Sequence, residues 1–416
     1  MTYTIIPPQH IDTTISLPPS KSISNRSLII YALSGGKTLP ENLSDCDDTK
    51  VVARALAHPS PVIDIMAAGT AMRFLTAYLS ITDGEHVITG TDRMKHRPIG
   101  VLVDALRTLG ADISYEESEG FPPLRIRGHA LEGGRLEMPG NVSSQFISAL
   151  LLIAPAMKRG LELELKGETI SRPYIDLTLW TMKEYGADAD WAGASTISVK
   201  PQPYKPHLYS IENDWSAASY WYEMIALCND STSQVKLTGL MDSSKQGDSI
   251  IKYIFSLLGV RTTFEHDEVT GNTITTLSRK IGRVQHLDFD FINCPDLAQT
   301  VVVTCCALGI SFHFTGLGSL KIKETDRLEA LKKELSKMGF LIQSRNDNEL
   351  SWDHEHTEPN FKPIDTYQDH RMAMAFAPLA LTHSRLSINN PEVVSKSYPK
   401  FWDDLAKAGF IINKTV

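Results

Sequence analysis

The chain has 416 residues, of which 42% are hydrophobic and 22% charged, a composition typical of a globular protein too large for one compact core. The 41 Lys and Arg residues against 49 Asp and Glu residues give a net charge of −8, so no general attraction to nucleic acid or acidic membranes is expected. Apolar runs such as 146–157 are shorter than the roughly 20 residues that cross a bilayer, which excludes a membrane-spanning class.

The termini and cysteines indicate a reducing compartment. Residues 1–8 lack the basic and apolar pattern of a secretory signal. The five cysteines are an odd number without CxxC spacing, which favours reduced thiols over disulfides or structural zinc. We therefore expect a cytoplasmic protein.

Two kinds of helix are predicted to alternate along the chain. One kind begins with small polar or charged residues and continues into an unbroken apolar stretch, which predicts a buried helix. These helices are expected to begin near Ser24, Thr70, Ser144, Ser216, Ala298 and His370. The other kind is amphipathic and ends on a glycine, which can form the left-handed residue that closes a helix. It is predicted at 102–110, 179–186, 254–259, 331–339 and 405–409, with strands between the helices, for instance at 86–90 and 161–165.

The spacing of these helices predicts an internal repeat. From Thr70 onward the buried helix recurs every roughly 70 to 80 residues, and its amphipathic partner ends roughly 40 residues after each start. A further copy beginning at Ser24 is shorter. Six α/β units over this length favour two domains of three units each, while two unrelated α/β domains with ordinary helix spacing are the alternative.

Several familiar sites are excluded or disfavoured. The segment around Lys37 lacks the first glycine of a phosphate-binding loop, and the segment 316–321 lacks the third glycine of a dinucleotide loop. No nucleotide cofactor is therefore supported. His354, Glu355 and His356 are adjacent in a polar stretch without helical spacing, which favours a solvated loop over a metal site.

Cationic residues occur where buried helices are expected to begin. Lys21 and Arg26 lie among prolines and serines at 19–26, and a helix N-terminus with free N–H groups binds phosphate well. A serine cap with incidental basic residues is an equal alternative for this segment alone. The stretch 68–73 repeats the pattern with a glycine, and 142–145 repeats it with neutral hydrogen-bonding groups.

The second half of the chain contains three further candidate segments. If 321–327 is helical, Lys323 and Arg327 lie one turn apart, which favours either a bound anion or a salt-bridged helix start. Asp369, His370 and Arg371 precede a strongly apolar helix and need partners there. Asp296 precedes another such helix and is an N-cap by default, or a general base if it faces a substrate hydroxyl.

Taken together, these segments resemble the 5-enolpyruvylshikimate-3-phosphate synthase family, that is, the 3-phosphoshikimate 1-carboxyvinyltransferases. The matching motifs are PSKSISNR at 19–26, AGTAMR at 68–73, HRPIG at 96–100, SSQF at 143–146, SRPYIDLTL at 171–179, KETDRL at 323–328, DHRMAM at 369–374 and KSYPKFW at 396–402. They occur in the family's order and cover nearly the whole chain.

The resemblance implies a two-domain, inside-out α/β fold, with three βαβαββ repeats in each domain and the active site in the interdomain cleft. One domain would hold residues 19–211 and the other residues 1–18 plus 212–416. The implied reaction transfers the enolpyruvyl group of phosphoenolpyruvate to the 5-hydroxyl of shikimate 3-phosphate and releases phosphate through a tetrahedral intermediate. This is a step of the shikimate pathway to chorismate and the aromatic amino acids. The resemblance implies no metal and no organic cofactor, a monomer, and inhibition by glyphosate in competition with phosphoenolpyruvate.

The resemblance also implies roles for individual residues. Ligands of shikimate 3-phosphate would be Lys21, Ser22, Arg26, Ser143, Ser144, Gln145, Ser171, Asp296 and Lys323. Ligands of phosphoenolpyruvate would be Lys21, Gly69, Arg97, Gln145, Arg327, Arg371 and Lys396. Asp296 would take the hydroxyl proton, and Glu324 with Lys21 or Lys396 would act at the methylene carbon.

Two departures from the family pattern leave alternatives open. Ala67 and Ser319 stand where the family usually has asparagine, so two amide hydrogen bonds are lost. A catalytically silent binding paralogue is therefore one alternative, although Lys21, Asp296, Glu324, Arg371 and Lys396 are retained. The other is the related transferase that acts on UDP-N-acetylglucosamine, which usually has a reactive cysteine where 85–97 has none.

Overall fold

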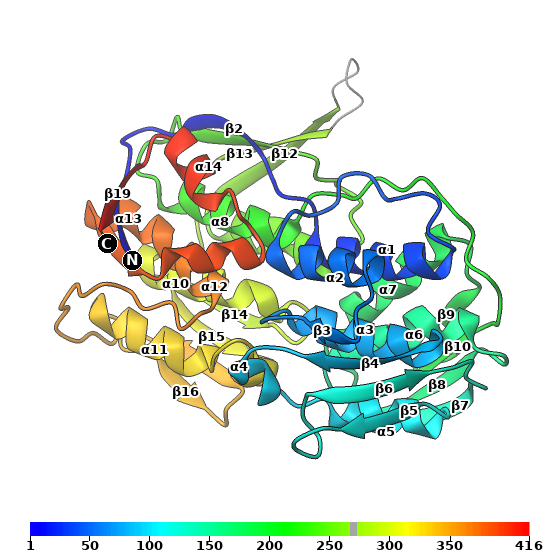
Figure 1. Cartoon of the computed structure of the whole chain (residues 1–416). Coiled ribbons are helices and arrows are strands. Elements are labelled where there is room, and N and C mark those ends of the chain that lie inside the picture. The colour runs from blue at the N-terminus through cyan, green and yellow to red at the C-terminus, as the bar shows by residue number, and fades with distance from the viewer. Residues whose placement is uncertain (267–272, 416) are drawn as a thin grey trace. The chain divides into compact units, whose positions relative to one another are not determined.

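The computed structural model describes residues 1–266 and 273–415. The chain forms two compact units, each with its own hydrophobic core. Pro19–Glu212 form what we call the continuous unit. Met1–Pro18 and Asn213–Val416 form the discontinuous unit. Figure 1 shows the elements of each unit along the chain.

The continuous unit alternates helices with short strands. Its helices are α1 (Lys21–Leu33), α2 (Asp47–Ala57), α3 (Gly69–Ile81), α4 (Asp92–Lys95), α5 (Gly100–Thr108), α6 (Ser144–Ile153), the 3-10 turn η1 (Ala154–Ala156) and α7 (Arg172–Glu184). Its strands are β3 (Val62–Asp64), β4 (Gly84–Thr89), β5 (Asp112–Tyr115), β6 (Leu124–Gly128), β7 (Gly134–Pro139), β8 (Leu161–Lys166), β9 (Ala189–Trp191) and β10 (Thr196–Val199).

The discontinuous unit uses both ends of the chain. Its helices are α8 (Trp215–Leu227), η2 (Gly247–Ile250), α9 (Ile251–Leu257), η3 (Pro295–Leu297), α10 (Ala298–Leu308), η4 (Gly318–Ile322), α11 (Arg327–Lys337), α12 (His370–Phe376), η5 (Ala377–Leu379), α13 (Ala380–His383), η6 (Pro391–Lys396) and α14 (Phe401–Lys407). Its strands are β1 (Thr2–Ile6), β2 (Asp12–Ser16), β11 (Gln234–Thr238), β12 (Val260–His266), β13 (Thr273–Arg279), β14 (His286–Asp290), β15 (Ser311–Thr315), β16 (Gln343–Arg345), β17 (Glu349–Trp352), β18 (Leu386–Asn389) and β19 (Ile411–Thr415).

Four sheets share one topology, which is the structural form of the sequence repeat. Their strand orders are β3-β4-β6-β5, β7-β8-β10-β9, β14-β15-β17-β16 and β2-β11-β13-β12. In each sheet the first two strands in chain order pair in parallel, and the next two add to the second strand as an antiparallel hairpin. In the last of these sheets, β2 takes the first position, with Asp12 opposite Gln234.

The remaining two copies of the repeat are altered. The fifth sheet has the order β18-β1-β19 and is antiparallel, so that Tyr3 lies between Ile388 and Lys414. The first copy in the continuous unit consists of α1 and α2 and has no sheet of its own among the described residues. The missing strands account for its shorter spacing in the sequence.

The helix boundaries confirm most of the predicted starts and stops. The buried helices α6, α10 and α12 begin at the predicted residues, and α3 and α8 begin one residue earlier. Helix α1 begins at Lys21 instead of Ser24, because the Ser20 hydroxyl caps it by accepting from the Ile23 amide at 3.4 Å. The glycines that follow the amphipathic helices all have positive φ: Gly110, Gly186, Gly259, Gly339 and Gly409.

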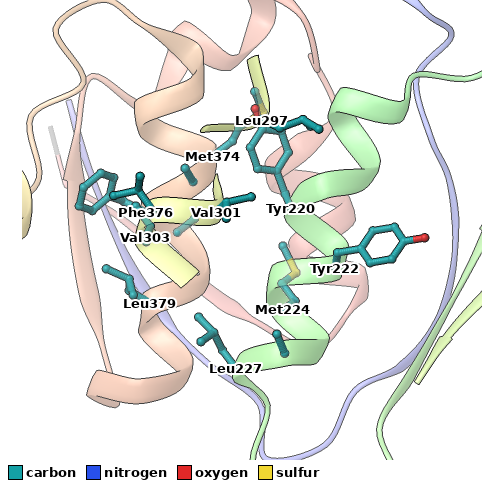
Figure 2. Close-up of a cluster of buried hydrophobic side chains, with 14 of the residues drawn as sticks. Tyr220, Tyr222, Met224, Leu227, Leu297, Val301, Val303, Met374, Phe376 and Leu379 are labelled. Atoms are coloured by element: carbon teal, nitrogen blue, oxygen red, sulfur yellow. The ribbon is translucent and has the colours of Figure 1, made fainter. Parts of the chain in front are cut away.

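The core of the discontinuous unit is built around three apolar helices. Figure 2 shows side chains of α8, α10 and α12 gathered in this core, among them Met224, Val301 and Met374. Each of these three side chains is at most 1% exposed. Burying such a side chain contributes roughly 1.5 to 3 kcal/mol, so the positions of the three helices are strongly determined. Their N-terminal residues are held in place as a consequence.

No helix in the part of the chain that the structure describes is long and apolar enough to cross a membrane. All five cysteines have free thiols and are buried.

Candidate active site

In the discontinuous unit, charged residues meet at the N-terminal ends of buried helices. Asp369 caps α12, accepting from the Arg371 amide at 2.9 Å, and its side chain is fully buried. Arg327, the first residue of α11, donates to the same carboxylate from Nε at 2.7 Å and from Nη2 at 3.4 Å. This two-pronged contact fixes the plane of the Arg327 guanidinium.

Asp296 lies between the cations of this group. Its Oδ1 is 3.1 Å from Arg327 Nη1 and 3.9 Å from Lys323 Nζ, and its Oδ2 is 2.9 Å from Arg371 Nη2. Arg327 Nη2 also donates to Glu324 Oε2 at 2.9 Å. We call Asp296, Lys323, Glu324, Arg327, Asp369 and Arg371 the arginine cluster. It brings together residues that are spread over more than 70 positions of the sequence.

The cluster perturbs the titration of its members. Burial raises the pKa of Asp296, but Arg371, Lys323 and Arg327 outweigh that effect and hold the pKa below its ordinary value. Burial lowers the pKa of Lys323, against the opposing effect of Asp296. Asp296 is therefore a carboxylate over the whole physiological pH range in this arrangement.

Lys396 lies beside the cluster without joining its ion pairs. Its Nζ donates to the backbone carbonyl of Gln368 at 2.9 Å, immediately before Asp369. Gln368 has a positive φ of 58°, a conformation that costs a non-glycine residue about 1 kcal/mol or more. The strain turns its carbonyl toward the Lys396 ammonium.

The structure decides two questions that the sequence left open in this region. The segment 321–327 is not one helix, because η4 ends at Ile322 and α11 begins only at Arg327. Asp326 is the N-cap of α11 and accepts from the Leu328 and Glu329 amides at 3.2 Å, so Lys323 and Arg327 are not neighbours on one helical turn. Asp296 is not an N-cap of α10 either, since it lies in η3 and its oxygens accept from arginine side chains.

In the continuous unit, the candidate residues other than Arg26 and Arg97 again lie at helix starts. Lys21, the first residue of α1, is 3.4 Å through Nζ from Asp48 Oδ2 of α2. Gln145 Nε2 in the first turn of α6 donates to Thr70 Oγ1 in the first turn of α3 at 3.1 Å. We call this group the helix-start cluster; it comprises Lys21, Ser22, Arg26, Gly69, Arg97, Ser143, Ser144, Gln145 and Ser171.

Arg26 is bound mainly by the protein itself. It donates to Thr178 Oγ1 at 2.7 Å, to Ser148 Oγ at 3.2 Å, and to the carbonyls of Ser22 and Tyr174 at 2.8 and 3.1 Å. These bonds use four of the five N–H groups of the guanidinium and join the N-terminal halves of α1, α6 and α7. Burial lowers the pKa of Arg26 to about 10, and the side chain remains charged at neutral pH. A substrate ligand role for Arg26 would rest on one remaining N–H.

The absence of a side chain at Gly69 leaves room for the Arg97 guanidinium. A Cβ atom added to Gly69 would be 2.6 Å from Arg97 Nη1, closer than real contacts allow. Arg73 holds the two segments together, because Nη1 donates to the Gly69 carbonyl and Nη2 to the Pro98 carbonyl, both at 3.1 Å. Only glycine at 69 leaves the Arg97 guanidinium in this place.

The serines at the starts of α6 and α7 differ in their roles. Ser143 caps α6 through a contact of 3.4 Å from the Gln145 amide to its hydroxyl. Ser171 precedes α7 with a left-handed φ of 53°, and its hydroxyl does not cap that helix. A strained residue at a helix start is consistent with a binding function, because strain of this kind often persists at functional sites.

The sequence did not reveal every residue of these groups. Asp48, the ion partner of Lys21, could not be aligned with any motif of the family. Its pairing with Lys21 follows from the packing of α2 beside α1. Asp369 was singled out as a residue in need of partners but not as a site residue. Asp248 also interacts electrostatically with Asp296 and Arg371 of the arginine cluster. No motif in the surrounding sequence identifies it as a site residue.

Metal binding receives no support from the described residues, which contain no group of three His, Cys, Asp or Glu side chains able to hold an ion. His354 and His356 lie in a loop beside Trp352, where their rings make aromatic contacts. The chemistry available is that of cations, carboxylates and hydroxyls at helix N-termini, which suits substrates with phosphate and carboxylate groups.

Comparison with solved structures defines the class of fold. EPSP synthase from Acinetobacter baumannii matches with a TM-score of 0.77 at 20% identity, covering 99% of this chain and 100% of that one. The enolpyruvyl transferase NikO from Streptomyces tendae matches with a TM-score of 0.73 at 15% identity, covering 100% and 98%. The chain has the two-domain enolpyruvyl transferase fold.

Sequence comparison identifies the family within that class. The family model for EPSP synthase (3-phosphoshikimate 1-carboxyvinyltransferase) matches residues 56–405. A 3-phosphoshikimate 1-carboxyvinyltransferase of Bacteroides fragilis is 56% identical over 411 residues, covering 99% of this chain and 98% of the relative. One of Mannheimia succiniciproducens is 35% identical, covering 97% and 98%. The chain belongs to the EPSP synthase family.

Proposed function

We propose that this chain transfers the enolpyruvyl group of phosphoenolpyruvate to the 5-hydroxyl of shikimate 3-phosphate and releases phosphate, as a transferase of aromatic amino acid biosynthesis. The observation that carries the proposal is 56% identity to a 3-phosphoshikimate 1-carboxyvinyltransferase over 99% of the chain. All residues of both clusters except Asp296 lie in the matched sequence motifs. The two alternatives raised by the sequence, a UDP-N-acetylglucosamine transferase and a silent paralogue, are not favoured by any of the relatives named above.

The charge of the substrates explains why two cationic groups are needed. Each substrate carries a phosphate and a carboxylate, so roughly five to six negative charges are bound together, and each pair at 4 Å costs about 4 kcal/mol at an effective dielectric of 20. The matching cations are Lys21, Arg26, Arg97, Lys323, Arg327, Arg371 and Lys396. Helix N-termini supply further N–H groups for the same oxygens.

The proposal assigns ligands in both units to one reaction. For shikimate 3-phosphate they are Lys21, Ser22, Arg26, Ser143, Ser144, Gln145, Ser171, Asp296 and Lys323. For phosphoenolpyruvate they are Lys21, Gly69, Arg97, Gln145, Arg327, Arg371 and Lys396. Arginine is favoured for phosphoenolpyruvate because its planar fork fits carboxylate and phosphate oxygens in pairs.

Asp296 is proposed as the general base for the 5-hydroxyl. Its lowered pKa makes it a weak base while Arg371, Lys323 and Arg327 surround it. Substrate anions that bind these cations offset their positive charge, which raises the proton affinity of Asp296. The carboxylate would therefore become an effective base only when both substrates are present.

The addition step requires that a proton be delivered to C3 of phosphoenolpyruvate. The 5-oxygen bonds to C2 of phosphoenolpyruvate, its proton passes to Asp296, and the electron pair of the C2–C3 double bond takes a proton at C3. We assign that delivery to Glu324 with Lys21 or Lys396. The tetrahedral adduct then loses the C3 proton, the double bond re-forms, and the C2–O bond to phosphate breaks.

A phosphate-release assay tests this function. The chain is incubated with phosphoenolpyruvate and either shikimate 3-phosphate or UDP-N-acetylglucosamine, and inorganic phosphate is measured. Release with shikimate 3-phosphate alone is expected. Release only with the sugar nucleotide would replace the proposed substrate, and no release with either would favour the binding paralogue.

Three finer properties belong to the same proposal. We expect the chain to act in the cytoplasm, as a monomer, and to be inhibited by glyphosate in competition with phosphoenolpyruvate. Size-exclusion chromatography with light scattering checks the monomer. An apparent affinity for phosphoenolpyruvate that stays constant as glyphosate rises would contradict the competition.

A further inference from the structure

Arg26 is a buried cation whose charge the continuous unit does not neutralise. It lies in α1 and is 3% exposed. Among the residues that the structure describes, no carboxylate forms an ion pair with it, and its hydrogen bonds go to hydroxyl and carbonyl oxygens. Arg327 is held differently, because three carboxylates contact it. A guanidinium held by neutral oxygens keeps its positive charge available to an anion.

Two buried hydroxyls, Ser148 of α6 and Thr178 of α7, meet at the Arg26 guanidinium. Thr178 Oγ1 is 2.7 Å from Nε, Ser148 Oγ is 3.2 Å from Nη2, and the two hydroxyl oxygens are 2.8 Å apart. The ring of Phe74 in α3 lies against the guanidinium, with its centroid 5.5 Å from Cζ. The hydroxyls thus hold the edge of the guanidinium, while the ring packs against it.

The directions of these hydrogen bonds follow from what each group can donate. The Tyr174 carbonyl can only accept, so the single Thr178 O–H donates to it at 2.8 Å. Arg26 Nε can only donate, so the Thr178 oxygen accepts from it. The bond between the two hydroxyls is then donated by Ser148, whose own oxygen accepts from Arg26 Nη2. One Arg26 N–H is left over by the described residues, and it is on Nη1, the atom that also donates to the Ser22 carbonyl.

We propose that Thr178 and Ser148 are positioning residues that fix the Arg26 guanidinium for the anionic groups of shikimate 3-phosphate. The inference rests on the proposed function, in which Arg26 is a ligand of this substrate. Neutral hydroxyls suit this task because they set the plane of the guanidinium without cancelling its charge, as a carboxylate would. Neither hydroxyl has to contact the substrate itself.

Thr178→Val tests the proposal, because valine keeps the branched shape of threonine and lacks the hydroxyl. The matched control is Thr181→Val in the same helix. Thr181 is also fully buried, and its hydroxyl also donates to the carbonyl four residues earlier, that of Leu177, at 2.7 Å. Both variants therefore lose the same kind of helix bond, but only Thr178→Val removes an acceptor from Arg26.

Steady-state kinetics give the expected results. KM for shikimate 3-phosphate should rise about tenfold or more in Thr178→Val, because a hydrogen bond to a charged group is lost. KM for phosphoenolpyruvate and kcat should change little, since Arg26 is not assigned to that substrate. Thr178→Ser restores the hydroxyl, so it should return KM for shikimate 3-phosphate to within about twofold of the wild type, as should Thr181→Val.

Four results would overturn the proposal. They are an unchanged KM for shikimate 3-phosphate in Thr178→Val, an equal rise in Thr181→Val, a loss confined to kcat, and a Thr178→Ser variant as impaired as Thr178→Val. If Thr178→Val does not fold, Ser148→Ala replaces it. Arg26 Nη2 then loses one of its two acceptors, and KM for shikimate 3-phosphate should rise about threefold or more. An unchanged KM in Ser148→Ala would contradict the inference.

A binding measurement separates this inference from the proposed function. Calorimetric titration of the full chain with shikimate 3-phosphate alone measures affinity without turnover. Weaker binding by Thr178→Val than by the wild type and Thr181→Val would support the inference even if no phosphate were released in the assay above. Equal affinity of all three proteins, together with phosphate release by the wild type, would refute the inference alone. A wild type that does not bind shikimate 3-phosphate would refute both.

Discussion

Replacement of Arg327 by methionine is the sharpest test of how the arginine cluster is held together. The Arg327 side chain is 2% exposed and contacts the carboxylates of Asp296, Glu324 and Asp369 at 2.7 to 3.1 Å. Methionine keeps most of the volume and removes the charge. Asp369, whose side chain is fully buried, then loses the cation that lies against it.

The expected loss in the free energy of unfolding is about 3 to 5 kcal/mol at pH 7, the usual cost of removing one partner from a buried ion pair. Its pH dependence follows from Asp296, whose pKa is lowered in the folded state. Such a carboxylate stabilises the fold above its unfolded pKa, and this contribution disappears as the pH falls through the folded pKa. The difference between wild type and Arg327→Met should therefore be largest near neutral pH and should shrink below about pH 4.

Urea unfolding followed by tryptophan fluorescence measures the effect, since Trp215, Trp221 and Trp352 lie in the same unit as Arg327. Arg345→Met, at an exposed position of β16, is the control and should change stability by no more than about 0.5 kcal/mol. Adding Asp369→Asn to Arg327→Met should recover about 1 kcal/mol or more, because the charge left without Arg327 is then gone. A loss below about 1 kcal/mol at pH 7, or one independent of pH, would refute this account of the cluster.

Three further changes test other parts of the structure. Gly69→Ala places a Cβ 2.6 Å from Arg97 Nη1, so the guanidinium must move. We expect KM for phosphoenolpyruvate to rise about tenfold or more. An unaltered KM would count against the proposed role of Arg97. Asp296→Asn should lower kcat by about 10² to 10⁴, and near-normal turnover with unchanged binding would exclude Asp296 as the base. Burial raises the pKa of Glu223 well above its ordinary value, so wild-type stability should fall as the pH rises from about 4.5 through the folded pKa. Glu223→Gln should not show this fall. Urea titrations at pH 5 and pH 8 that give the same change in stability for both proteins would disprove the prediction.

The local part of the structure was predictable from local signals. Buried helices were recognisable because every face of α6 or α10 is apolar, and their ends were recognisable because a glycine with positive φ follows the amphipathic partners. Such signals act within a few residues, where backbone sterics and helix capping decide the conformation. The repeat then followed from spacing alone.

The long-range part of the structure was not predictable in this way. Asp326 breaks the segment that was considered as one helix, because its carboxylate caps α11 and leaves Lys323 outside. The pairing of Lys21 with Asp48, and of Asp248 with Ser216, depends on how separate helices pack, and no spacing in the sequence records it. Motif matching named Arg26 as a ligand, whereas most of its N–H groups bind the protein, a distinction visible only in three dimensions.

The placement of β1 between β18 and β19 has a consequence for how the chain folds during synthesis. The continuous unit consists of Pro19–Glu212 and has all its sheet partners within that stretch, so it can be completed while later residues are still being made. Strand β1 leaves the ribosome before any of this unit, yet both of its neighbours come from residues beyond 385. It therefore has no sheet partners until residues 386–389 and 411–415 have been synthesised. Shortening or extending β19 is therefore expected to affect the yield of folded protein, although β19 contributes no residue to either cluster.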